Sequence, residues 1–228
     1  MPLARNVRQQ LRVERVVEEA PGVISISITG RRLDRMRAQP GQFFLWRFLT
    51  RDRWWQAHPF SLSAPPDGRR LRITVKESGD FTAGLRQLPP GTRVLAEGPF
   101  GAFTAEARRR QRVALIAGGA GITPIRALVE TLPGGSGDIA LVYRAPRAEE
   151  LVFRDELDEL SRTRGTEIHY LVGDEGGLSA DTLERLLPDI AKRDVFVCGP
   201  PVMVEATRAS LRAAGVPRRQ IFSERFAL

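Results

Sequence analysis

Cysteine and histidine are both scarce in this chain. Its 228 residues include one cysteine, Cys198, and two histidines, His58 and His169. A single cysteine excludes an internal disulfide and any iron–sulfur or zinc site that takes four cysteines. Because the two histidines lie far apart in the sequence, we expect no metal centre built by this chain alone.

Long hydrophobic runs are absent as well. Residues 113–125 form a run of thirteen without a charge, whereas a membrane-spanning helix needs about 20 apolar residues. The opening segment, MPLARNVRQQLRVER, has no apolar stretch after its charges and does not resemble a secretory leader. We therefore expect a cytoplasmic protein, with a place at the cytoplasmic face of a membrane as the alternative.

Lysine is rare, although the chain is basic. The net charge of +8 comes from arginine, since Lys76 and Lys192 are the only lysines. A basic face can bind nucleic acid or anionic lipid. Acidic residues are interleaved with the arginines, however, and the one dense basic run is residues 108–112. We expect no nucleic-acid partner, and a basic N-terminal region facing a membrane is the better of these two alternatives.

The first half has the pattern of a small β-barrel. Isoleucine and serine alternate over residues 23–29, as in a half-buried strand. Further strands are predicted at 42–48, 61–64, 71–76 and 94–97, separated by turns rich in glycine and proline. Short strands at this spacing favour a barrel or sandwich, and we assign residues 1–107 to an antiparallel, Greek-key type barrel.

The second half alternates strands with helices. Strands are predicted at 113–117, 139–143, 168–172 and 195–198, and helices at 124–131, 148–164, from Ser179 onward and at 203–213. This order calls for a parallel sheet covered on both faces. We assign residues 108–228 to an α/β domain, with the boundary near residues 104–111.

Two glycine turns follow predicted strands of the α/β domain. The first, GGAGITP, runs from Gly118 to Pro124 and opens a helix, where free N–H groups and close backbone approach suit a pyrophosphate. Proline replaces the last glycine of the dinucleotide fingerprint, so a purely structural turn is the alternative. The second turn, CGPP, begins at Cys198 and lies at the same sheet edge, although a strand-end cysteine is often a small buried hydrophobe.

Four motifs together carry a family resemblance. They are HPFSLS from His58, GDFT from Gly79, GGAGITP, and CGPPVM from Cys198. In this order and spacing they resemble the ferredoxin–NADP reductase superfamily over nearly the whole chain. HPFS, and the lysine of KESGDFT, are closest to the dehydrogenase portion of ferric reductases and NADPH oxidases, which a membrane haem domain usually precedes.

The resemblance implies that the barrel binds FAD. Phe60 would stack on the isoalloxazine, Ser61 would hydrogen-bond near its N5, and Gly79 with Thr82, which would start a helix, would hold the pyrophosphate. His58 stands where the family usually has arginine, and a solvated loop histidine is its alternative. The residues expected at FAD are His58, Pro59, Phe60, Ser61, Ser63, Thr74, Val75, Lys76, Gly79, Phe81, Thr82 and Phe226.

The resemblance likewise implies an NADP site in the α/β domain. Arg144 and Arg147 follow the second strand, where NAD-selective sites usually place an acid for the ribose hydroxyls. NADPH is therefore favoured as donor, with NADH as the alternative. The residues expected there are Gly119, Ala120, Gly121, Thr123, Pro124, Tyr143, Arg144, Arg147, Cys198, Gly199, Pro200 and Met203.

The implied reaction is hydride transfer from NADPH to FAD, then one-electron transfer to a haem domain or another acceptor protein. Ser61, Cys198, Glu224 and Phe226 would surround the reacting rings, with Cys198 positioning the nicotinamide and Phe226 either shielding the flavin or anchoring the C-terminus. A free-standing flavin, ferredoxin or ferric-chelate reductase is the first alternative. A non-catalytic nucleotide-binding module is the second.

Three tryptophans, Trp46, Trp54 and Trp55, precede the HPFS motif. Aromatic residues in this position could face a partner protein. We expect them to pack in the core instead.

Overall fold

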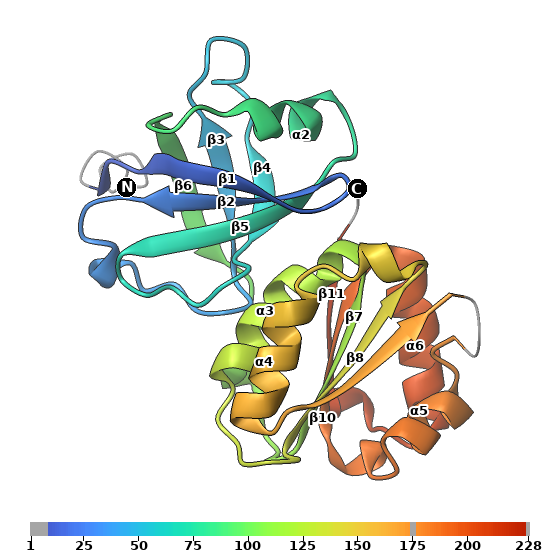
Figure 1. Ribbon diagram of the computed structural model, residues 1–228. Helices are drawn as coiled ribbons and strands as arrows, with labels where there is room; N and C mark the ends of the chain where they lie inside the picture. The colour runs from blue at the N-terminus through green and yellow to red at the C-terminus, as the bar shows by residue number, and fades with distance from the viewer. Residues whose placement is uncertain (1–8, 174–176, 227–228) are drawn as a thin grey trace.

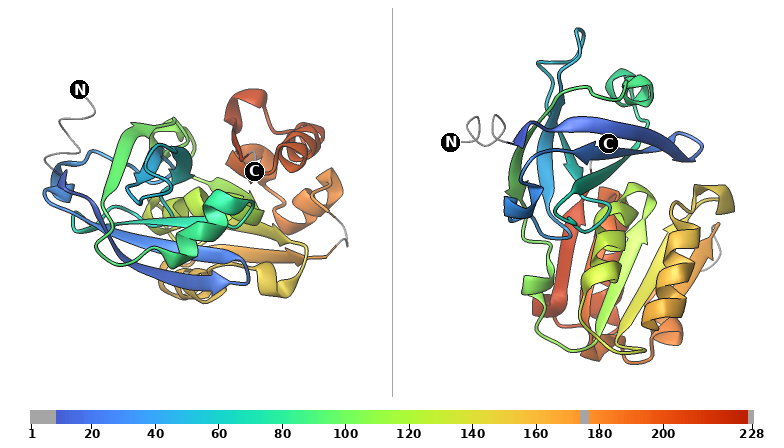
Figure 2. Two further views of the ribbon diagram at one scale, coloured as in Figure 1. Left: turned by 90° about the horizontal axis from the view of Figure 1, so that it is seen from above. Right: turned by 60° about the vertical axis from the view of Figure 1, so that its left-hand side comes forward.

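The computed structural model describes residues 9–173 and 177–226. In these residues the strands form three sheets, two antiparallel ones in the first half of the chain and a parallel one in the second (Figure 1). The antiparallel sheets sit over one edge of the parallel sheet, as both views in Figure 2 show. A barrel followed by an α/β domain, the predicted fold class, is confirmed.

The barrel consists of two three-stranded sheets with the orders β1-β2-β5 and β4-β3-β6. Their bounds are β1 Arg12–Ala20, β2 Val23–Thr29, β3 Phe43–Phe48, β4 His58–Ser61, β5 Arg70–Lys76 and β6 Val94–Phe100. Apolar side chains from both sheets, such as Ile26, Trp46 and Ile73, fill the space between them. The HPFS motif thus forms the edge strand β4. The strand predicted at 61–64 therefore begins three residues earlier than expected.

Two elements of the barrel differ from the sequence prediction. The strand β1 was not predicted, because the charges of RVERVVEEA hide any apolar alternation: within the strand Val13 alone is buried, and the other residues are intermediate or exposed. The helix α2, Asp80–Gly84, begins at Asp80 instead of Thr82 and continues as a 3₁₀ turn over Leu85–Gln87.

The parallel sheet has the order β11-β10-β7-β8-β9. Its strands are β7 Val113–Gly118, β8 Ile139–Ala145, β9 Glu167–Val172, β10 Asp194–Gly199 and β11 Ile221–Arg225. The helices α3 Ile122–Thr131 and α4 Arg154–Arg164 cover one face, and α5 Ala180–Leu186 and α6 Pro201–Ala213 cover the other (Figure 1). Both faces of β7 are buried, since Leu115 packs toward α3 and Ile116 toward α5 and α6.

The predicted helix at 148–164 is interrupted. A 3₁₀ turn covers Ala148–Glu150, and α4 begins only at Arg154. Between them Leu151, Val152 and Phe153 enter the core, and Phe153 takes a left-handed backbone conformation with φ 65°. Core burial of three consecutive apolar residues is incompatible with one continuous amphipathic helix.

The arginine run at 108–112 makes several hydrogen bonds within the fold, although residues 109–112 are exposed. The guanidinium of Arg108 donates to the carbonyls of Pro133 and Gln111. The backbone N–H groups of Arg109 and Arg110 donate to the carboxylate of Asp194, which is fully buried. Within the described residues, no helix is long and apolar enough to cross a membrane.

An ion-pair network joins the barrel to the α/β domain. Arg72 on β5 donates to both carboxylate oxygens of Glu156 on α4, at 2.7 and 2.9 Å. Arg126 on α3, which is 9% exposed, pairs with the same carboxylate at 2.7 Å and also with Glu130. Burial alone would raise the pKa of Glu156, but Arg72 and Arg126 outweigh it and lower that pKa. Glu156 is therefore an anion that holds two cations from opposite sides of the domain junction.

Replacing Glu156 by alanine is expected to lower the free energy of unfolding by about 2 kcal/mol, because Arg126 then lies nearly buried with Glu130 as its remaining carboxylate partner. For a chain of this size, that corresponds to a drop in Tm of about 4–8 °C. The measurement is thermal unfolding at neutral pH. Because the folded-state pKa is lowered, the stabilisation is present above the unfolded pKa and is lost as pH falls through the folded one.

Glu159→Ala is the control for this prediction. Glu159 lies on the same helix, but its side chain is 53% exposed and pairs only with Arg162 among the described residues. Exposed pairs contribute about 0–1 kcal/mol, so its Tm should stay near that of the parent. Equal Tm values for the two variants would show that the Glu156 network does not brace the junction.

Candidate active site

The cleft between the barrel and the parallel sheet holds two adjoining cavities of about 520 and 240 Å³. They share four residues, namely Thr74 and Lys76 from β5 and Ala120 and Thr123 from the first glycine turn and α3. The cavities therefore form one continuous site at the carboxyl ends of the parallel strands. Ligands bind in this position in open α/β sheets.

The larger cavity collects most of the residues predicted to bind FAD. The described lining residues from that set are His58, Pro59, Phe60, Ser61, Thr74, Val75, Lys76, Thr82 and Phe226. Ala120, Thr123 and Glu224 also line it and were predicted for the nucleotide or the reacting rings, whereas Phe43 and Leu45 on β3, Ser78 and Arg225 were not predicted. The proximity of Phe43 and Leu45 results from the register of β3 with β4, in which Phe43 pairs with Ser61 and Leu45 with Pro59.

Two polar atoms in this cavity have no partner among the described residues. Ser61 is 3% exposed, and its Oγ makes no hydrogen bond there. The Oε2 atom of Glu224 is likewise buried and unpaired, and burial raises the pKa of Glu224 to about 7. Buried polar groups are normally satisfied, so the two atoms fit a site that a polar ligand such as FAD or a nicotinamide completes.

His58 forms an aromatic stack at the end of β4. Its ring lies 3.7 Å from the ring of Phe81, centroid to centroid, at an interplanar angle of 21°. Burial lowers the pKa of His58, which favours the neutral ring. Phe81 packs behind His58 against the barrel core and is not among the cavity-lining residues, so its contact with FAD stays a prediction.

Ser63 also lies away from the cavity. It is fully buried, and its Oγ accepts a hydrogen bond from Thr74 Oγ1 at 2.8 Å. The Thr74 hydroxyl is in turn 2.7 Å from Ser25 Oγ on β2. The Ser63 hydroxyl is therefore engaged with Thr74, which does line the cavity, and the contact between Ser63 and FAD stays a prediction.

The predicted pyrophosphate segment folds as the first turn of α2. Thr82 Oγ1 accepts from the N–H of Ser78 at 2.8 Å and donates to the carbonyl of Gly79 at 3.0 Å. Gly79 has φ 154°, and a Cβ placed on it would meet no atom within 4 Å. Thr82 and Ser78 therefore face the cavity from a turn that their own hydrogen bonds hold in shape.

The glycines of the first turn have different roles. Gly119 has φ 53° and open space where a Cβ would stand, so it suits close approach of a ligand. Gly121 is buried against β10, and its Cβ would lie 2.2 Å from the carbonyl oxygen of Cys198. Pro124 is buried inside α3. The predicted ligand contacts therefore fit Gly119, Ala120 and Thr123, whereas Gly121 and Pro124 serve packing.

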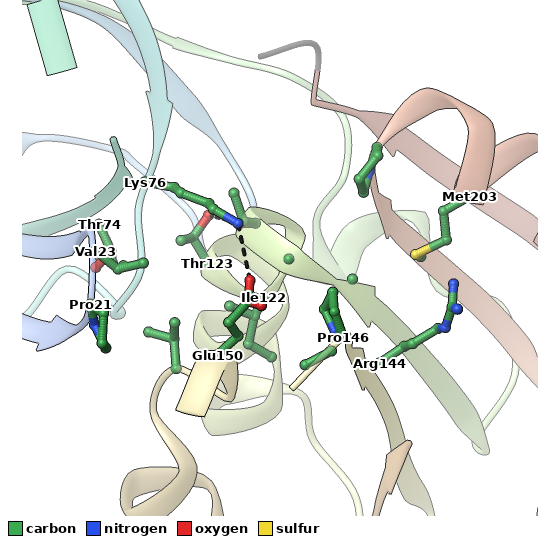
Figure 3. Close-up of a pocket in the computed structure, with 16 residues that line it drawn as sticks. Pro21, Val23, Thr74, Lys76, Ile122, Thr123, Arg144, Pro146, Glu150 and Met203 are labelled. Carbon is green, nitrogen blue, oxygen red and sulfur yellow. Dashed lines mark hydrogen bonds and ion pairs between the residues drawn. The ribbon is translucent and has the colours of Figure 1, made fainter. Parts of the chain in front are cut away.

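The smaller cavity holds part of the predicted nucleotide set. Arg144, Pro200 and Met203 line it, and Figure 3 shows the guanidinium of Arg144 directed toward Met203. Tyr143 is fully buried, and its hydroxyl donates to the carbonyl of Glu150 and accepts from the N–H of Val152. The hydroxyl of Tyr143 is thus engaged within the protein, and a contact between this residue and a nucleotide stays a prediction.

Arg147 points away from the same cavity. Its side chain is 68% exposed and pairs with Glu149 and Glu150. Arg144 lines the cavity and Arg147 does not, so the place of Arg147 at the nucleotide stays a prediction. Glu150 itself lines the cavity; it was not predicted there, because residues 148–164 were expected to form one charged amphipathic helix.

Cys198 ends β10 beside Glu224 of β11 in the parallel register. Its thiol is fully buried, and burial, with the Glu224 charge, raises its pKa well above the ordinary value. A neutral thiol suits the predicted positioning role and not a nucleophile. Gly199 accepts a backbone hydrogen bond from the N–H of Phe226 at 3.0 Å, which carries Phe226 to the wall of the larger cavity.

The three tryptophans separate into two environments. Trp46 is fully buried in the barrel and donates to the carbonyl of Phe60 at 2.9 Å, which confirms the expected core packing. Trp54 and Trp55 are 59% and 54% exposed on the turn between β3 and β4, so the same expectation is wrong for them. Their rings pack edge to face, with centroids 5.9 Å apart.

Comparison with known families agrees with this division of the chain. A model of an FAD-binding domain matches residues 21–104, and one of an oxidoreductase NAD-binding domain matches residues 115–209. The ferredoxin reductase component of a 3-ketosteroid-9-alpha-monooxygenase from Mycolicibacterium smegmatis is 33% identical over 238 residues, 99% of this chain and 67% of that protein. The chain belongs to the ferredoxin–NADP reductase superfamily.

Solved structures of superfamily members share the fold. The FAD/NAD-binding domain of a nitric oxide dioxygenase from Vibrio cholerae superposes with a TM-score of 0.82 at 24% identity, covering 96% of this chain and 99% of that one. A ferredoxin NADP+ reductase from Neisseria gonorrhoeae with bound FAD and NADP gives 0.80 at 19% identity, covering 95% and 97%. At these identities the likeness establishes the fold and no more.

The chain is shorter than several superfamily relatives. It spans between 56% and 67% of the length of the 3-ketosteroid-9-alpha-monooxygenase reductase components that it matches. It also matches a probable electron transfer subunit of dihydroorotate dehydrogenase B from Methanopyrus kandleri, 31% identical over 80% of this chain and 67% of that protein. These relatives share the FAD- and NAD-binding parts but are named for different systems.

Proposed function

We propose that this chain takes electrons from NADPH onto FAD and delivers them one at a time to a separate acceptor protein. The observation that carries the proposal is the pair of buried, unpartnered atoms, Ser61 Oγ and Glu224 Oε2, in one cavity. That cavity adjoins the glycine turn of the nucleotide side through Ala120 and Thr123. Hydride transfer requires a site that holds the donor ring against the acceptor ring.

The residues of the larger cavity fit FAD. When bound, FAD accepts a hydride and releases electrons singly, which no side chain can do. Phe60 offers an aromatic face and Ser61 a hydroxyl that can donate or accept, while Thr82 and Ser78 lie at the α2 end of the cavity. We place the boundary between the FAD domain and the nucleotide domain at residues 107 and 108.

The nucleotide side fits a dinucleotide whose diphosphate lies at the start of α3. The open Gly119 and the hydroxyl of Thr123 face the cavity there, together with the N–H groups of the first helical turn. Arg144 lines the cavity and carries a positive charge that would suit a 2′-phosphate, whereas Arg147 does not line it and pairs with Glu149 and Glu150. We propose NADPH as the preferred donor on this ground, with NADH accepted more weakly.

Two kinds of acceptor follow from two kinds of observation. Relatives named as reductase components of monooxygenases favour an acceptor that belongs to an oxygenase system. The HPFS sequence at His58 and the KESGDFT sequence at Lys76 favour a membrane haem domain, as in ferric reductases and NADPH oxidases. We propose the oxygenase type first. Reduction of an isolated ferredoxin would favour it, and reduction of a b-type haem protein would favour the membrane haem domain.

The test of the proposed function is a visible spectrum of the protein mixed with FAD, before and after anaerobic NADPH. We expect a bound-flavin spectrum that NADPH bleaches faster than NADH does at equal concentration. A protein that retains no FAD on gel filtration would favour the non-catalytic alternative. FAD binding with no bleaching by either nucleotide would overturn the hydride mechanism while leaving the flavin site intact.

A further inference from the structure

We propose that Glu150 positions the ammonium group of Lys76 in the nucleotide cleft. When the dinucleotide binds, its diphosphate takes the place of the Glu150 carboxylate at Lys76. This inference rests on the proposed function, and it concerns how tightly the nucleotide binds. Neither the motifs nor the comparisons assign a role to Glu150. Its role follows from the place of one ion pair.

The pair crosses the cleft from the barrel to the α/β domain. Lys76 ends β5, and its Nζ lies 3.3 Å from Oε2 of Glu150 in the 3₁₀ turn that follows β8. In Figure 3 the two side chains meet in the middle of the cavity, with Thr123 beside them and Arg144 farther along. A molecule that fills the length of this cavity must therefore contact the pair or move it.

Glu150 is held in this place by its own surroundings. Its second carboxylate oxygen accepts from Nε of Arg147 at 3.1 Å. Its backbone carbonyl accepts from the buried hydroxyl of Tyr143 at 3.3 Å, and the same hydroxyl accepts from the N–H of Val152. The 3₁₀ turn is thus bound to the core of the α/β domain. The side chain of Glu150 is only 23% exposed.

Lys76 is the lysine that both cavities share. Across from it stand Gly119 and Thr123, at the helix start where a diphosphate would bind. A diphosphate there places negative charge beside Lys76 and also beside the Glu150 carboxylate. Charges of like sign a few Å apart repel in a partly buried site, so Glu150 must give up Lys76 to the diphosphate.

The consequence is a penalty on nucleotide binding that applies to NADPH and NADP+ alike. Glu150 keeps the ammonium group in position when the cleft has no nucleotide, and it weakens the hold on the oxidised product. Removal of its charge should therefore tighten both nucleotides. It should also make their binding more dependent on salt, because Lys76 then faces the diphosphate without a competitor.

The experiment measures the Kd of NADP+ for the FAD-loaded protein at low and high ionic strength. For Glu150→Gln we expect a Kd about 3- to 10-fold lower than that of the parent, equivalent to about 0.7–1.4 kcal/mol, and a steeper rise with salt. The matched control is Glu149→Gln. Glu149 is the neighbouring carboxylate, is 58% exposed and pairs with Arg147 but not Lys76, so its Kd should stay within about 2-fold.

A second comparison ties the effect to Lys76. In a Lys76→Met background, with flavin content checked by absorbance, Glu150→Gln should change the Kd by less than about 2-fold. Glu150→Asp should keep parent-like affinity if its shorter carboxylate still reaches Lys76. An unchanged or higher Kd for Glu150→Gln overturns the inference, as does tightening that persists without Lys76. If the parent protein binds no NADP+ at all, the proposed function itself fails.

Discussion

Gly121→Ala is expected to abolish NADPH-dependent bleaching of the flavin and to lower the free energy of unfolding by about 3 kcal/mol. The added Cβ would lie 2.2 Å from the carbonyl oxygen of Cys198 and 2.6 Å from the backbone nitrogen of Gly199. Both neighbours are backbone atoms at the end of β10, so no side-chain rotation can relieve the overlap. Either α3 or the end of β10 must move, and both glycine turns lie there.

The matched control is Gly119→Ala, two residues earlier in the same turn. Gly119 needs a left-handed backbone, with φ 53°, but a Cβ on it would meet no atom within 4 Å. Alanine there costs about 1–2 kcal/mol of backbone strain and should weaken nucleotide binding without abolishing the reaction. Urea unfolding gives the two stabilities. Equal stability for both variants would mean that the contact between Gly121 and β10 adapts without loss.

The two glycines show what the sequence could predict and where it stopped. The turn, its place after a strand and its place before a helix follow from residues adjacent in the chain, and all three were predicted. Which glycine meets a ligand and which meets the protein depends on β10, about 80 residues later. Sequence spacing within the motif holds no information on that contact.

The same distinction applies to the rest of the candidate site. His58, Phe60 and Ser61 were predicted because they lie within one short motif that forms β4. Phe43 and Leu45 were missed, since only the pairing of β3 with β4 brings them to the cavity. A side chain contributed by a neighbouring strand carries no local signal of its own.

Orientation was harder to predict than position. Tyr143 ends a strand that is buried on both faces, so the alternation of apolar and polar residues cannot show which way its ring points. Its hydroxyl holds the turn that carries Glu150 instead of facing the cleft. The predictions therefore located the carboxyl ends of the correct strands, whereas only the folded chain shows which side chains line the cavity there.

Glu224→Gln is expected to remove most of the pH dependence of stability and of flavin reduction near neutral pH. Burial raises the folded-state pKa of Glu224 to about 7, above the usual value for a glutamate. The folded protein thus holds an extra proton between roughly pH 4.5 and 7. The contribution of Glu224 to the free energy of unfolding is therefore greatest below about pH 4.5 and falls as pH rises to about 7.

The variant has no proton to lose, so it should be more stable than the parent at pH 8, on the order of 2 kcal/mol, and nearly equal to it at pH 5. Urea unfolding at the two pH values measures the difference. Glu205→Gln is the control, because Glu205 is an exposed carboxylate on α6 that pairs with Arg225 and Arg208. It should keep the parent's slope of stability against pH.

Flavin reduction gives the second readout. Glu224 Oε2 lies unpartnered in the larger cavity, on the strand next to Cys198. In its protonated form the carboxyl group can donate a hydrogen bond to negative charge that develops there, whereas its ionised form opposes that charge. The parent's rate of NADPH-dependent bleaching should therefore fall about 10-fold or more as pH rises from 6 to 8. Glu224→Gln should keep a nearly level rate over that range, because its amide donates at every pH. A parent-like slope in the variant would place the controlling proton on another group.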